Sequence, residues 1–587
     1  MLNYSASIER MVGESGKYRS WKRQTVLTAL LLFAMTFAVA RIPVAFFPLH
    51  QVQSQDVVPL IVLAASLLVV AFLIPRWRLP AHLPSAGWLA ATSLVMVGLL
   101  ALGTHSLMGN LPLSADERMV VFDMAVFDSM RLAAPLAASW RPYATTLVPA
   151  FLLYEDMPTG LVSAYLPMNA LLRLAFSKVA DPAIFNPLLV LVGGAALLDI
   201  ARRTFGRNNP ACWVILLIYA LSAQTLVAAM TTYSMTAHMA LNLIWLAAFL
   251  RGGYRGHSVA ILTGFVATGL HQIAFHPFFV APFLLWQFRQ GDRKLVLIYG
   301  AAYLAIILWW AYYPILAGYE VAGGLQQPPH SSLIDRISTA FAERRGDTAI
   351  TMFLNLLRFV AWQNVAMLPL LVGSITVVVR DGELPAALLL SIFSWLIFVA
   401  VVIPFQGHGW GYRYLHPYLG NFALLAGYGY QELKEVIGEK VDGLVLSLSG
   451  VTAVATIPLT LIATYKFLEP HVALERVITA QQTPMVLIDT YPRPTTDGKW
   501  ASNAIENVLN LPDLSNRPLR LSTLNMNGEL LAGLCRKGKI TLIGRAEQQR
   551  AGFALNAARE SPSFAKLTNT VRRKMPHCLV SARGLPQ

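Results

Sequence analysis

The sequence predicts a polytopic α-helical membrane protein with about 13 transmembrane helices and a small soluble α/β domain at its C-terminus. Of its residues, 56% are hydrophobic and only 13% are charged, whereas a soluble domain is about 25% charged. Apolar runs of about 18–25 residues recur along most of the chain, and each is long enough to cross a hydrocarbon core of about 30 Å. Strand-like alternation is absent before the C-terminal part, which argues against an outer-membrane barrel.

The predicted spans follow one another along most of the chain, with uncertain ends. They cover residues 25–46, 57–74, 86–104, 182–201, 210–230, 235–250, 258–272, 274–288, 294–313, 355–379, 384–405, 413–430 and 443–467.

Basic residues set the orientation of these spans, because Lys and Arg stay on the cytoplasmic side. The N-terminal segment 1–23 is basic near its end, and Arg or Lys residues follow every second span. These clusters are Arg76 and Arg78; Arg202, Arg203 and Arg207; Arg251 and Arg255; Arg289, Arg293 and Lys294; Arg380; and Lys434 and Lys440. We therefore expect a bacterial inner-membrane protein with a cytoplasmic N-terminus and a periplasmic or extracellular C-terminus.

Three regions follow from this topology. Residues 1–23 form a cytoplasmic segment, residues 24–468 a multi-span catalytic domain, and residues 469–587 an external domain. The multi-span part has large external loops at 105–181 and 314–350. In the first of these loops, the apolar stretches 143–154 and 161–177 either lie in the membrane interface or form an extra pair of spans.

The tail from 469 onward alternates strand and helix signals. "MVLIDT" (485–490) and "KITLIG" (539–544) predict buried strands, and "ASNAIENVLNL" (501–511) predicts a helix. The tail carries 16 Lys and Arg against 9 Asp and Glu, so it either binds a polyanionic surface or is simply solvated. Cys535 and Cys578 both lie here, and an oxidising exterior permits a disulfide between them.

The net charge of +15 is largely accounted for by the cytoplasmic loops, so we expect no nucleic-acid partner. The sequence has no Walker A motif, no G-x-G-x-x-G, no G-x-S-x-G and no H-E-x-x-H. ATP-driven transport and protease or esterase chemistry therefore lose support.

Asp116 and Glu117 interrupt the apolar chain in the first external loop. Ser114 and Glu117 have the S-x-x-E spacing of a capping box ahead of a helix from about 115 to 131. The alternative is that one of these carboxylates is a base or a metal ligand at the membrane edge. The two interpretations are compatible, because a cap also fixes the position of the carboxylate. Asp123, two turns on, either assists or is solvated.

A second group of polar residues is "GHGWGYRYLHP", 407–417, at the external entrance to a helix. It contains His408, Tyr412, Arg413 and Tyr414 among three glycines that permit close backbone approach. A guanidinium at this depth binds phosphate well. The alternative is an arginine that reaches the lipid head groups, with the tyrosines in the interface.

Other external residues are weaker candidates for binding substrate. His271 and His276 lie in the tight link of "GLHQIAFHPFF", 269–279, where each is either part of a cavity lining or a core histidine. Arg131 and Arg141 are further phosphate candidates. Loop 314–350 is either a lid over an external site or a solvated loop.

These features together resemble the GT-C superfamily of integral-membrane glycosyltransferases, in particular its protein-mannosyltransferase and lipid A aminoarabinose-transferase branch. The resemblance covers most of residues 100–468. Its carriers are the pair Asp116-Glu117, "LPMNALLRLAF" (166–176), "NPLLVLVGGAALLDIARRTFGR" (186–207) and "GWGYRYLHPYL" (409–419).

The resemblance implies a sugar donor linked to a polyprenyl phosphate and a cell-envelope acceptor: a glycan, lipid or protein hydroxyl. Asp116 would act as general base in an inverting transfer, and Arg413, with Arg131 or Arg141, would stabilise the departing phosphate. Glu117 would orient the acceptor or, with Asp116, hold a divalent cation such as Mg²⁺ or Mn²⁺. Membrane lipids surround the chain and give the donor its path.

The sequence departs from that branch in two places. The acidic pair follows the third predicted span rather than the first, and Tyr165-Leu-Pro-Met replaces the more usual Pro-Pro. Two rival functions stay open: a transporter or flippase of lipid-linked glycans, which predicts ionisable groups near the bilayer midplane, and a non-catalytic scaffold, which does not require Asp116, Glu117 and Arg413 to converge.

Overall fold

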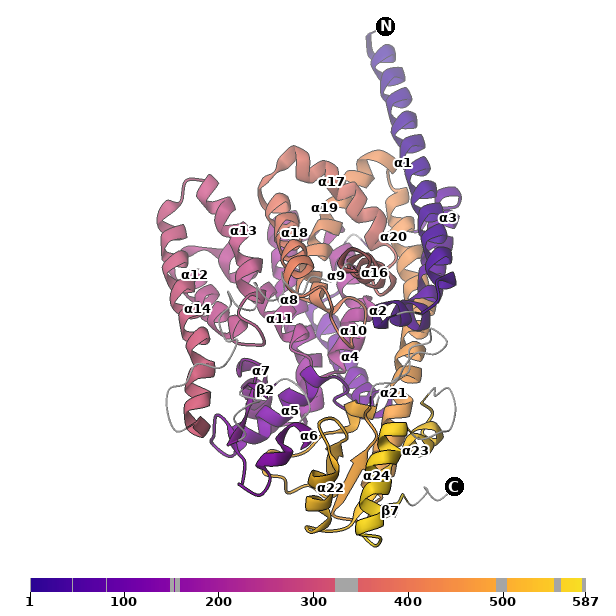
Figure 1. The fold of residues 1–587 in the computed structure, drawn as a ribbon. Coiled ribbons are helices and arrows are strands. Elements are labelled where there is room, and N and C mark those ends of the chain that lie inside the picture. The colour runs from indigo at the N-terminus through magenta and orange to yellow at the C-terminus, as the bar shows by residue number, and fades with distance from the viewer. Residues whose placement is uncertain are drawn as a thin grey trace.

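The structure is a computed structural model that describes residues 2–44, 46–80, 82–147, 152–153, 159–322, 347–491, 504–553 and 561–582. In these ranges it is mostly helical, with small sheets confined to one end (Figure 1). The fold class that the sequence predicts, a helical membrane protein with a small C-terminal α/β part, is confirmed.

Seven helices in the described ranges are long and apolar enough to cross a membrane. They are α1 (Leu2–Arg41), the continuous helix of α2 (Phe47–Gln51), η1 (Val52–Asp56) and α3 (Val57–Phe72), α4 (Ala86–Ser106), η3 (Pro182–Ile184) with α8 (Phe185–Phe205), α14 (Arg293–Ala322), α18 (Glu383–Val402), and the continuous helix of α20 (Lys440–Val451), η5 (Thr452–Thr456) and α21 (Ile457–Thr479).

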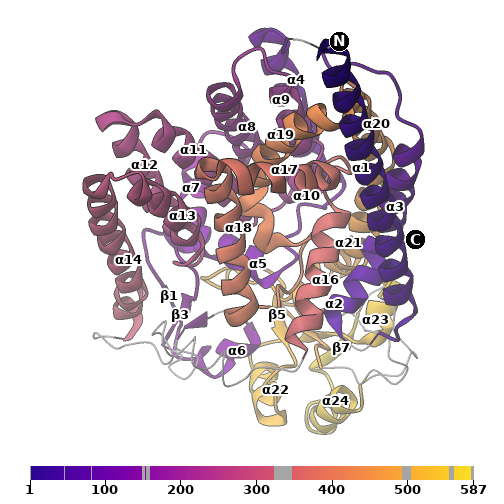
Figure 2. The same ribbon diagram turned by 90° about the horizontal axis from the view of Figure 1, so that it is seen from above.

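The remaining apolar helices are shorter or broken, so a count of 13 spans is not confirmed. They are α9 (Ala211–Ala220) and α10 (Ala223–Ala229), which form a pair bent by 50°, and α11 (Met235–Arg251), α12 (Gly253–Thr268), α13 (Phe275–Arg289), α16 (Thr348–Ala361), α17 (Met367–Asp381) and α19 (Leu419–Ile437). The predicted span 355–379 is divided between α16 and α17, and 413–430 begins as a 3₁₀ turn, η4 (Arg413–Tyr418). Seen from above, α10 and α17 lie near the middle of the view, with α12 and α14 toward one edge and α1 and α3 toward the other (Figure 2).

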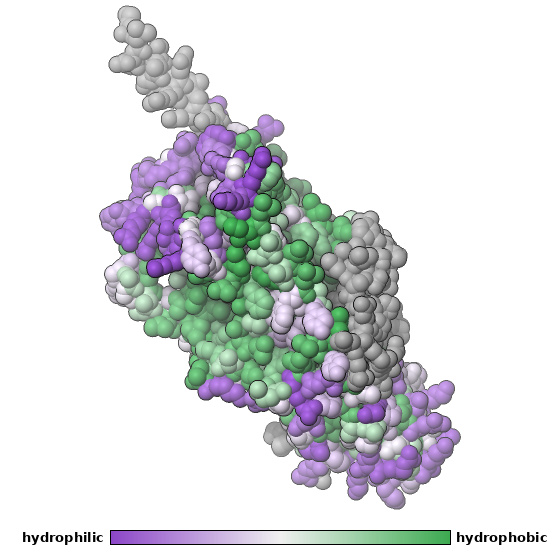
Figure 3. Space-filling model, turned by 90° about the vertical axis from the view of Figure 1, so that its left-hand side faces the viewer, coloured by the Kyte–Doolittle hydropathy of each residue, from purple (hydrophilic) through white to green (hydrophobic). Residues whose placement is uncertain are grey.

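The two ends of the helical body differ in composition. On the face shown in Figure 3, a hydrophobic band separates two hydrophilic ends. The end near the N-terminus gathers the basic residues that follow every second predicted span, and several are paired there: Arg251 with Asp199 at 3.2 Å and Arg380 with Glu432 at 3.1 Å. The C-terminal sheet lies at the opposite end.

The segment between α4 and α8 lies at the same end as the C-terminal sheet (Figure 1). It forms α5 (Ala115–Asp128), β1 (Ala134–Pro135), η2 (Arg141–Tyr143), α6 (Ala144–Leu147), β2 (Leu152–Leu153), β3 (Gly160–Ser163) and α7 (Met168–Ser177). The stretch 161–177 is not a span, because α7 has 10 residues and is only about 15 Å long. Most of 148–158, and residues 323–346 of the predicted lid loop, lie outside the described residues.

The C-terminal part contains a four-stranded parallel sheet in the order β5-β4-β6-β7. Its strands are β4 (Met485–Ile488), β5 (Leu519–Ser522), β6 (Ile540–Ile543) and β7 (Leu579–Ser581), and its helices are α22 (Gly528–Cys535), α23 (Arg545–Arg550) and α24 (Pro562–Lys574). Strands β4 and β6 lie where the sequence predicts them. The helix predicted over 501–511 is wrong in extent: only one 3₁₀ turn, η6 (Ala504–Asn507), forms in its described part.

Side chains on the two faces of β4 pack against different parts of the molecule and so fix the position of the sheet. Val486 and Ile488 pack on the end of α21, which runs past the predicted boundary at 468 to Thr479. Met485 and Leu487 face the other way, in a cluster that includes Met119 and Phe122 of α5. Since side chains alternate along a strand, the sheet is buried on both faces, and its core is continuous with the helix that carries Asp116.

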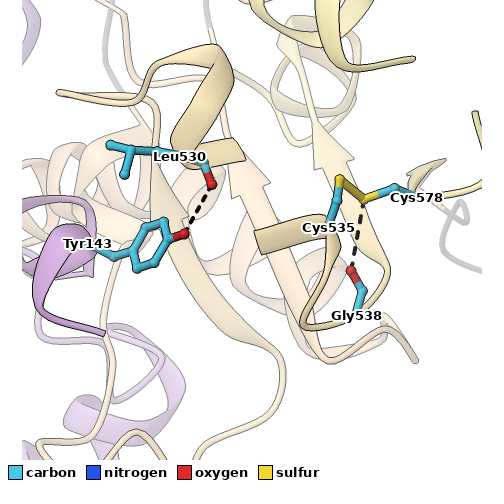
Figure 4. Close-up of a disulfide and its surroundings, with 5 residues drawn as sticks. All are labelled: Tyr143, Leu530, Cys535, Gly538 and Cys578. Carbon is cyan, nitrogen blue, oxygen red and sulfur yellow. Dashed lines mark hydrogen bonds between the residues drawn. A yellow bond between two sulfur atoms is a disulfide. The ribbon is translucent and has the colours of Figure 1, made fainter. Parts of the chain in front are cut away.

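The disulfide that the sequence permits is present. Cys535 at the end of α22 is bonded to Cys578 beside β7, and nearby the Tyr143 hydroxyl donates to the Leu530 carbonyl at 3.2 Å (Figure 4). The C-terminal part is therefore joined to the 105–181 segment by a hydrogen bond as well as by the shared core.

Candidate functional site

Helix α5 presents the two acidic residues, and its cap explains their placement. The Ser114 hydroxyl accepts a hydrogen bond from the Glu117 amide at 3.2 Å, while the Glu117 carboxylate accepts one from the Ser114 amide, also at 3.2 Å. The capping box is therefore confirmed. Asp116 and Glu117 are nevertheless buried, so the cap does not leave them in solvent as it does at an ordinary helix start.

Asp116 is paired with Arg413, although 297 positions separate them in the sequence. One carboxylate oxygen accepts from the Arg413 guanidinium, and the other accepts from the Tyr165 hydroxyl. Both side chains of the ion pair are about nine-tenths buried, at 9% and 10% exposed. The acid and the guanidinium that sequence analysis selected therefore face one another.

The glycine-rich segment 405–413 delivers Arg413 to this position. Gly411 has φ of 64°, and a Cβ there would lie 2.5 Å from the Gln224 side-chain oxygen, so only glycine fits. Gln224 in turn donates to the Tyr412 carbonyl at 2.9 Å, and Gln406 accepts from the Arg413 amide at 2.9 Å. The peptide bond that precedes Arg413 is thus held by buried side-chain amides at both its carbonyl and its N–H group.

Aromatic rings flank the guanidinium. The Arg413 Cζ lies 5.2 Å from the ring centres of both Tyr233 and Tyr414. Such contacts favour a cation and keep it flat between the rings. The Arg413 Nε has no hydrogen-bond partner among the described residues, so the donor set of this arginine is not filled.

Tyr165 contacts the Asp116 oxygen that Arg413 does not, and His271 stacks against Tyr165. Their rings stack at 4.3 Å, and main-chain bonds hold the two segments together: the Leu166 amide donates to the His271 carbonyl at 3.2 Å, and the Met168 amide donates to the Gly269 carbonyl at 2.9 Å. His271 is thus one of the predicted residues that the structure brings to the site.

Glu117 has different neighbours from Asp116. Its carboxylate accepts from the Thr232 amide at 3.1 Å, and Arg173 on α7 is close enough to act on it electrostatically. Thr232 therefore contacts Glu117, while the next residue, Tyr233, lies against Arg413. Two consecutive residues thus contact Glu117 and the partner of Asp116, respectively.

The electrostatics distinguish the carboxylates further. Burial would raise the pKa of Asp116, but Arg413, His271 and Tyr165 outweigh it and hold the pKa below its usual value. Burial raises the pKa of Glu117 to about 7 and that of Asp123, which is buried rather than solvated, to about 8. At neutral pH Asp116 is therefore ionised, Glu117 is about half protonated and Asp123 is mostly protonated.

A divalent cation has little room at these carboxylates. Each of the four oxygens of Asp116 and Glu117 already accepts a hydrogen bond: from Tyr165, Arg413, the Thr232 amide and the Ser114 amide. In the described part of the chain no group of three or more His, Cys, Asp or Glu side chains is placed to hold a metal ion. The residues around Asp116 and Glu117 therefore do not fit Mg²⁺ or Mn²⁺ in this arrangement.

Four other predicted residues have partners elsewhere. Arg131 is half exposed and lies 3.8 Å from Glu320; the exposed Arg141 donates to the Leu136 carbonyl at 3.2 Å. His276 is buried between Asn242 and Tyr303, at 2.8 Å from each, as a core histidine. The buried Tyr412 contacts Met352 through its hydroxyl at 3.7 Å.

His408 links the glycine-rich segment to the C-terminal part. Its ring lies 3.3 Å from Glu506, which also pairs with Arg118 at 2.8 Å, and its carbonyl accepts from the Tyr233 hydroxyl at 2.9 Å. Glu506 and Arg118 were missed by sequence analysis. The S-x-x-E motif points to α5, but nothing in the spacing connects Arg118 with the tail.

Sequence analysis also missed a second buried ion pair. Arg358 of α16 donates to Asp56 at 3.1 Å, and both side chains are fully buried. Asp56 stands at the edge of a predicted span, and Arg358 within one. A charge inside an apolar run is usually paired, which is the signal that would have predicted this contact.

Comparison with known proteins gives the fold. The crystal structure of ArnT from Cupriavidus metallidurans bound to undecaprenyl phosphate matches with a TM-score of 0.50 and 12% identity, covering 82% of this chain and 91% of that chain. The apo crystal structure of the same protein has a TM-score of 0.47 and 12% identity, covering 72% of this chain and 84% of that one. No family model and no curated protein sequence matches. The chain thus has an ArnT-like membrane fold.

Proposed function

We propose that this protein is a GT-C-type glycosyltransferase that moves a sugar from a polyprenyl-phosphate donor to a cell-envelope acceptor. The observation that carries the proposal is the buried contact between Asp116 and Arg413 on an ArnT-like fold. It supplies an ionised carboxylate next to a guanidinium, which are the groups needed for a base and for phosphate binding.

The reaction would begin when the donor phosphate takes the place of Asp116 on Arg413. A phosphate with two or more oxygens matches a guanidinium better than one carboxylate oxygen does. Asp116 would then be released from its cation, and its pKa would rise because its remaining environment is buried. The incoming phosphate would thus turn Asp116 into a stronger base at the moment when a base is needed.

In the transfer step, the acceptor oxygen forms a bond to the anomeric carbon as the bond from that carbon to the phosphate oxygen breaks. The acceptor proton goes to Asp116, and the bonding electrons leave with the polyprenyl phosphate, whose negative charge Arg413 stabilises. Attack from the face opposite the phosphate inverts the anomeric centre. The product is a glycosylated acceptor together with free polyprenyl phosphate.

Tyr165 and His271 would position the base. The Tyr165 hydroxyl donates to one oxygen of Asp116 and leaves the other for the acceptor proton once Arg413 has moved to the phosphate. Burial lowers the pKa of His271 to about 4, so its ring is neutral at pH 7 and does not compete with Arg413 for the phosphate. Glu117, with a pKa of about 7, is suited to orient an acceptor hydroxyl.

We place the site on the external face of the bacterial inner membrane, as the basic residues at the other end of the helices suggest. The donor would reach it from the surrounding lipid and the acceptor from the side of the C-terminal sheet. A requirement for Mg²⁺ or Mn²⁺ is not part of the proposal, since the oxygens of Asp116 and Glu117 are already engaged.

The proposal is tested with purified protein in lipid, a radiolabelled polyprenyl-phosphate sugar and a cell-envelope extract. We expect the label to remain with an acceptor after the donor lipid has been extracted. A labelled nucleotide sugar, used in place of the lipid donor, should give no transfer. Movement of the intact labelled lipid across the membrane without transfer would instead identify a flippase and overturn the proposal.

A further inference from the structure

A cleft of about 500 Å³ is lined by the face of α5 that carries Val121, Ala125 and Asp128. Its walls come from the end of α4, one face of α5, helix α7, the segment Thr231–Thr232 and, from the C-terminal part, Leu509 and Leu511. Volumes of about 300–1,000 Å³ are typical of sites for small molecules. The cleft takes no part in the proposed base and phosphate chemistry of Asp116 and Arg413.

Arg173 lines this cleft and is an unusual residue to find there, because it is 2% exposed. Its two Nη atoms donate to the carbonyls of Pro182 and Thr231 at 3.3 and 3.2 Å, and its Nε has no partner among the described residues. No carboxylate in the described ranges lies within ion-pair distance of it. The guanidinium also lies 5.0 Å from the centre of the Phe185 ring. Two carbonyls and a ring face stabilise a buried cation but do not supply the anion that would neutralise its charge.

The carboxylates nearest to Arg173 are already committed. Glu117 is close enough to interact electrostatically, but its pKa is about 7 and it accepts two amides. Asp128 and Asp181 line the cleft, yet Asp128 is paired with Lys178, and Asp181 lies 2.8 Å from His105. The positive charge of Arg173 is therefore left for something that enters the cleft.

The rest of the lining is suited to a sugar. Hydroxyl and amide groups come from Thr104, Asn110, Ser177 and Thr232, and apolar surface from residues such as Leu174 and Leu509. Hydroxyl and amide groups bind sugar hydroxyls, and apolar surface packs against the faces of a sugar ring. A ligand that satisfies all of these groups is hydroxylated and carries a negative charge.

The position of the cleft relates it to the proposed reaction. Thr232 lines the cleft and its amide binds Glu117, while the ring of the adjacent Tyr233 lies against Arg413. Glu117 and the adjacent residues Thr232 and Tyr233 therefore lie where the cleft borders the Asp116–Arg413 pair, so an acceptor held in the cleft is next to the proposed base.

We propose that the cleft binds the acceptor, and that the acceptor is a polyhydroxylated headgroup carrying a carboxylate or phosphate that pairs with Arg173. The cleft as an anion site stands on its own geometry; only the identification of its ligand as the acceptor rests on the proposed function.

The test measures binding without transfer, in lipid nanodiscs, by saturation-transfer difference NMR. The probes are glucuronate, glucose 6-phosphate and neutral glucose. We expect both anions to bind at least about tenfold more tightly than glucose, as a charge-assisted hydrogen bond predicts. Anions that bind no better than glucose, or do not bind, would overturn the proposal.

Three variants locate the binding. Ala125→Trp places a large ring in the cleft and should abolish binding of both anions, whereas Ala138→Trp, at an exposed position outside the cleft, should leave it unchanged. Arg173→Lys keeps the charge but loses the planar donors and should weaken anion binding about tenfold without changing glucose binding. Anion binding that survives Ala125→Trp would show that the ligand sits elsewhere.

Two further experiments complete the test. One asks whether the bound anion belongs to the donor or to the acceptor, and the other distinguishes failure of the anion site from failure of the proposed function. Farnesyl phosphate, a short donor-like lipid, should not displace glucuronate; displacement would assign the cleft to the donor phosphate and overturn the acceptor assignment. Anion binding in a protein that transfers no sugar would reject the proposed function and leave the anion site. An active transferase without anion binding would reject the cleft alone.

Discussion

Two of the buried carboxylate–arginine pairs in the described ranges, Asp56–Arg358 and Asp116–Arg413, touch the same glycine-rich segment but differ in how completely they are bonded. Asp56 and Arg358 join the helix of α2, η1 and α3 to α16, and Asp116 and Arg413 join α5 to segment 405–413. Arg358 also donates to the Gly409 carbonyl at 2.7 Å. The first pair therefore supports the loop that carries the second.

The Asp56–Arg358 pair is fully satisfied. All three guanidinium nitrogens donate, to Asp56, Gln51, Gln55 and the Gly409 carbonyl, and the second Asp56 oxygen accepts from the Trp362 ring at 2.5 Å. In the Asp116–Arg413 pair, the Arg413 Nε has no partner in the described ranges. Both pairs are buried, but only the second has an unused donor.

Whether every donor and acceptor of a buried ion pair is hydrogen-bonded distinguishes a structural pair from one that can bind a substrate. A buried pair with every donor and acceptor used has nothing to offer a substrate, and its removal harms folding. A pair with a free donor beside titratable neighbours can exchange one partner for a ligand. The buried charge of Arg358 therefore does not support the transporter alternative, which needs an open ionisable group in the membrane.

The largest effect is expected from Asp116→Asn. The amide keeps the shape and a hydrogen bond from Tyr165 but cannot take a proton, so we expect sugar transfer to fall by about 10³-fold. Transfer of label per mole of folded protein is the measurement. Binding of polyprenyl phosphate serves as the control and should be retained. Transfer at the wild-type rate would remove Asp116 as the base.

Asp56→Asn should reduce stability much more than it reduces sugar transfer. It leaves Arg358 without a counter-charge in a site with no exposure, and we expect the free energy of unfolding to fall by about 3 kcal/mol. Transfer per folded molecule should change much less than in Asp116→Asn. The matched double variant Asp56→Leu with Arg358→Met should recover most of the stability, as measured by thermal unfolding. A stable but inactive Asp56→Asn protein would erase the distinction between the two pairs.

The disulfide between Cys535 and Cys578 lies in the C-terminal part and belongs to neither ion pair. Cys535→Ser with Cys578→Ser removes a link across 43 positions, and we expect the C-terminal part to lose about 2 kcal/mol of stability. Transfer at low temperature should stay close to that of the wild type. Limited proteolysis of the C-terminal part against temperature is the measurement. Loss of transfer in a variant whose C-terminal part resists protease would give this region a direct role in the site.

The smallest effect concerns Glu117. Its pKa rises from 4.5 to about 7 in the fold, so the folded state keeps a proton that the unfolded chain releases between those values. Stability should therefore fall as pH rises through this window, and Glu117→Gln should remove that part of the slope. Infrared spectroscopy should show a protonated carboxyl band that titrates near pH 7 in the wild type. Asp123, with a pKa of about 8, should contribute a separate band in both proteins. A band that still titrates near pH 7 in Glu117→Gln would show that Glu117 is not its source.

Much of this arrangement could be predicted because it depends on local rules. Hydropathy and the placement of Lys and Arg predicted a helical membrane protein, S-x-x-E predicted the start of α5, and apolar runs predicted β4 and β6. The contact between Asp116 and Arg413 was expected only because both residues were assigned to the same side of the membrane.

The rest depends on tertiary contacts that no local pattern contains. The break between α16 and α17 lies within an apolar run, so hydropathy alone joined them into one span. Tyr165 and His271 meet through main-chain bonds between distant segments. Arg173 entered sequence analysis only as part of "LPMNALLRLAF", and its candidacy as a binding residue rests on tertiary observations: its unpartnered Nε and its place in the cleft lining.

A cryo-EM structure of the protein in nanodiscs with undecaprenyl phosphate tests the central claim most directly. We predict the lipid phosphate within about 3 Å of the Arg413 guanidinium, with Asp116 released from Arg413 and the Asp56–Arg358 pair unchanged. A phosphate bound elsewhere, with Asp116 and Arg413 still paired, would contradict the account.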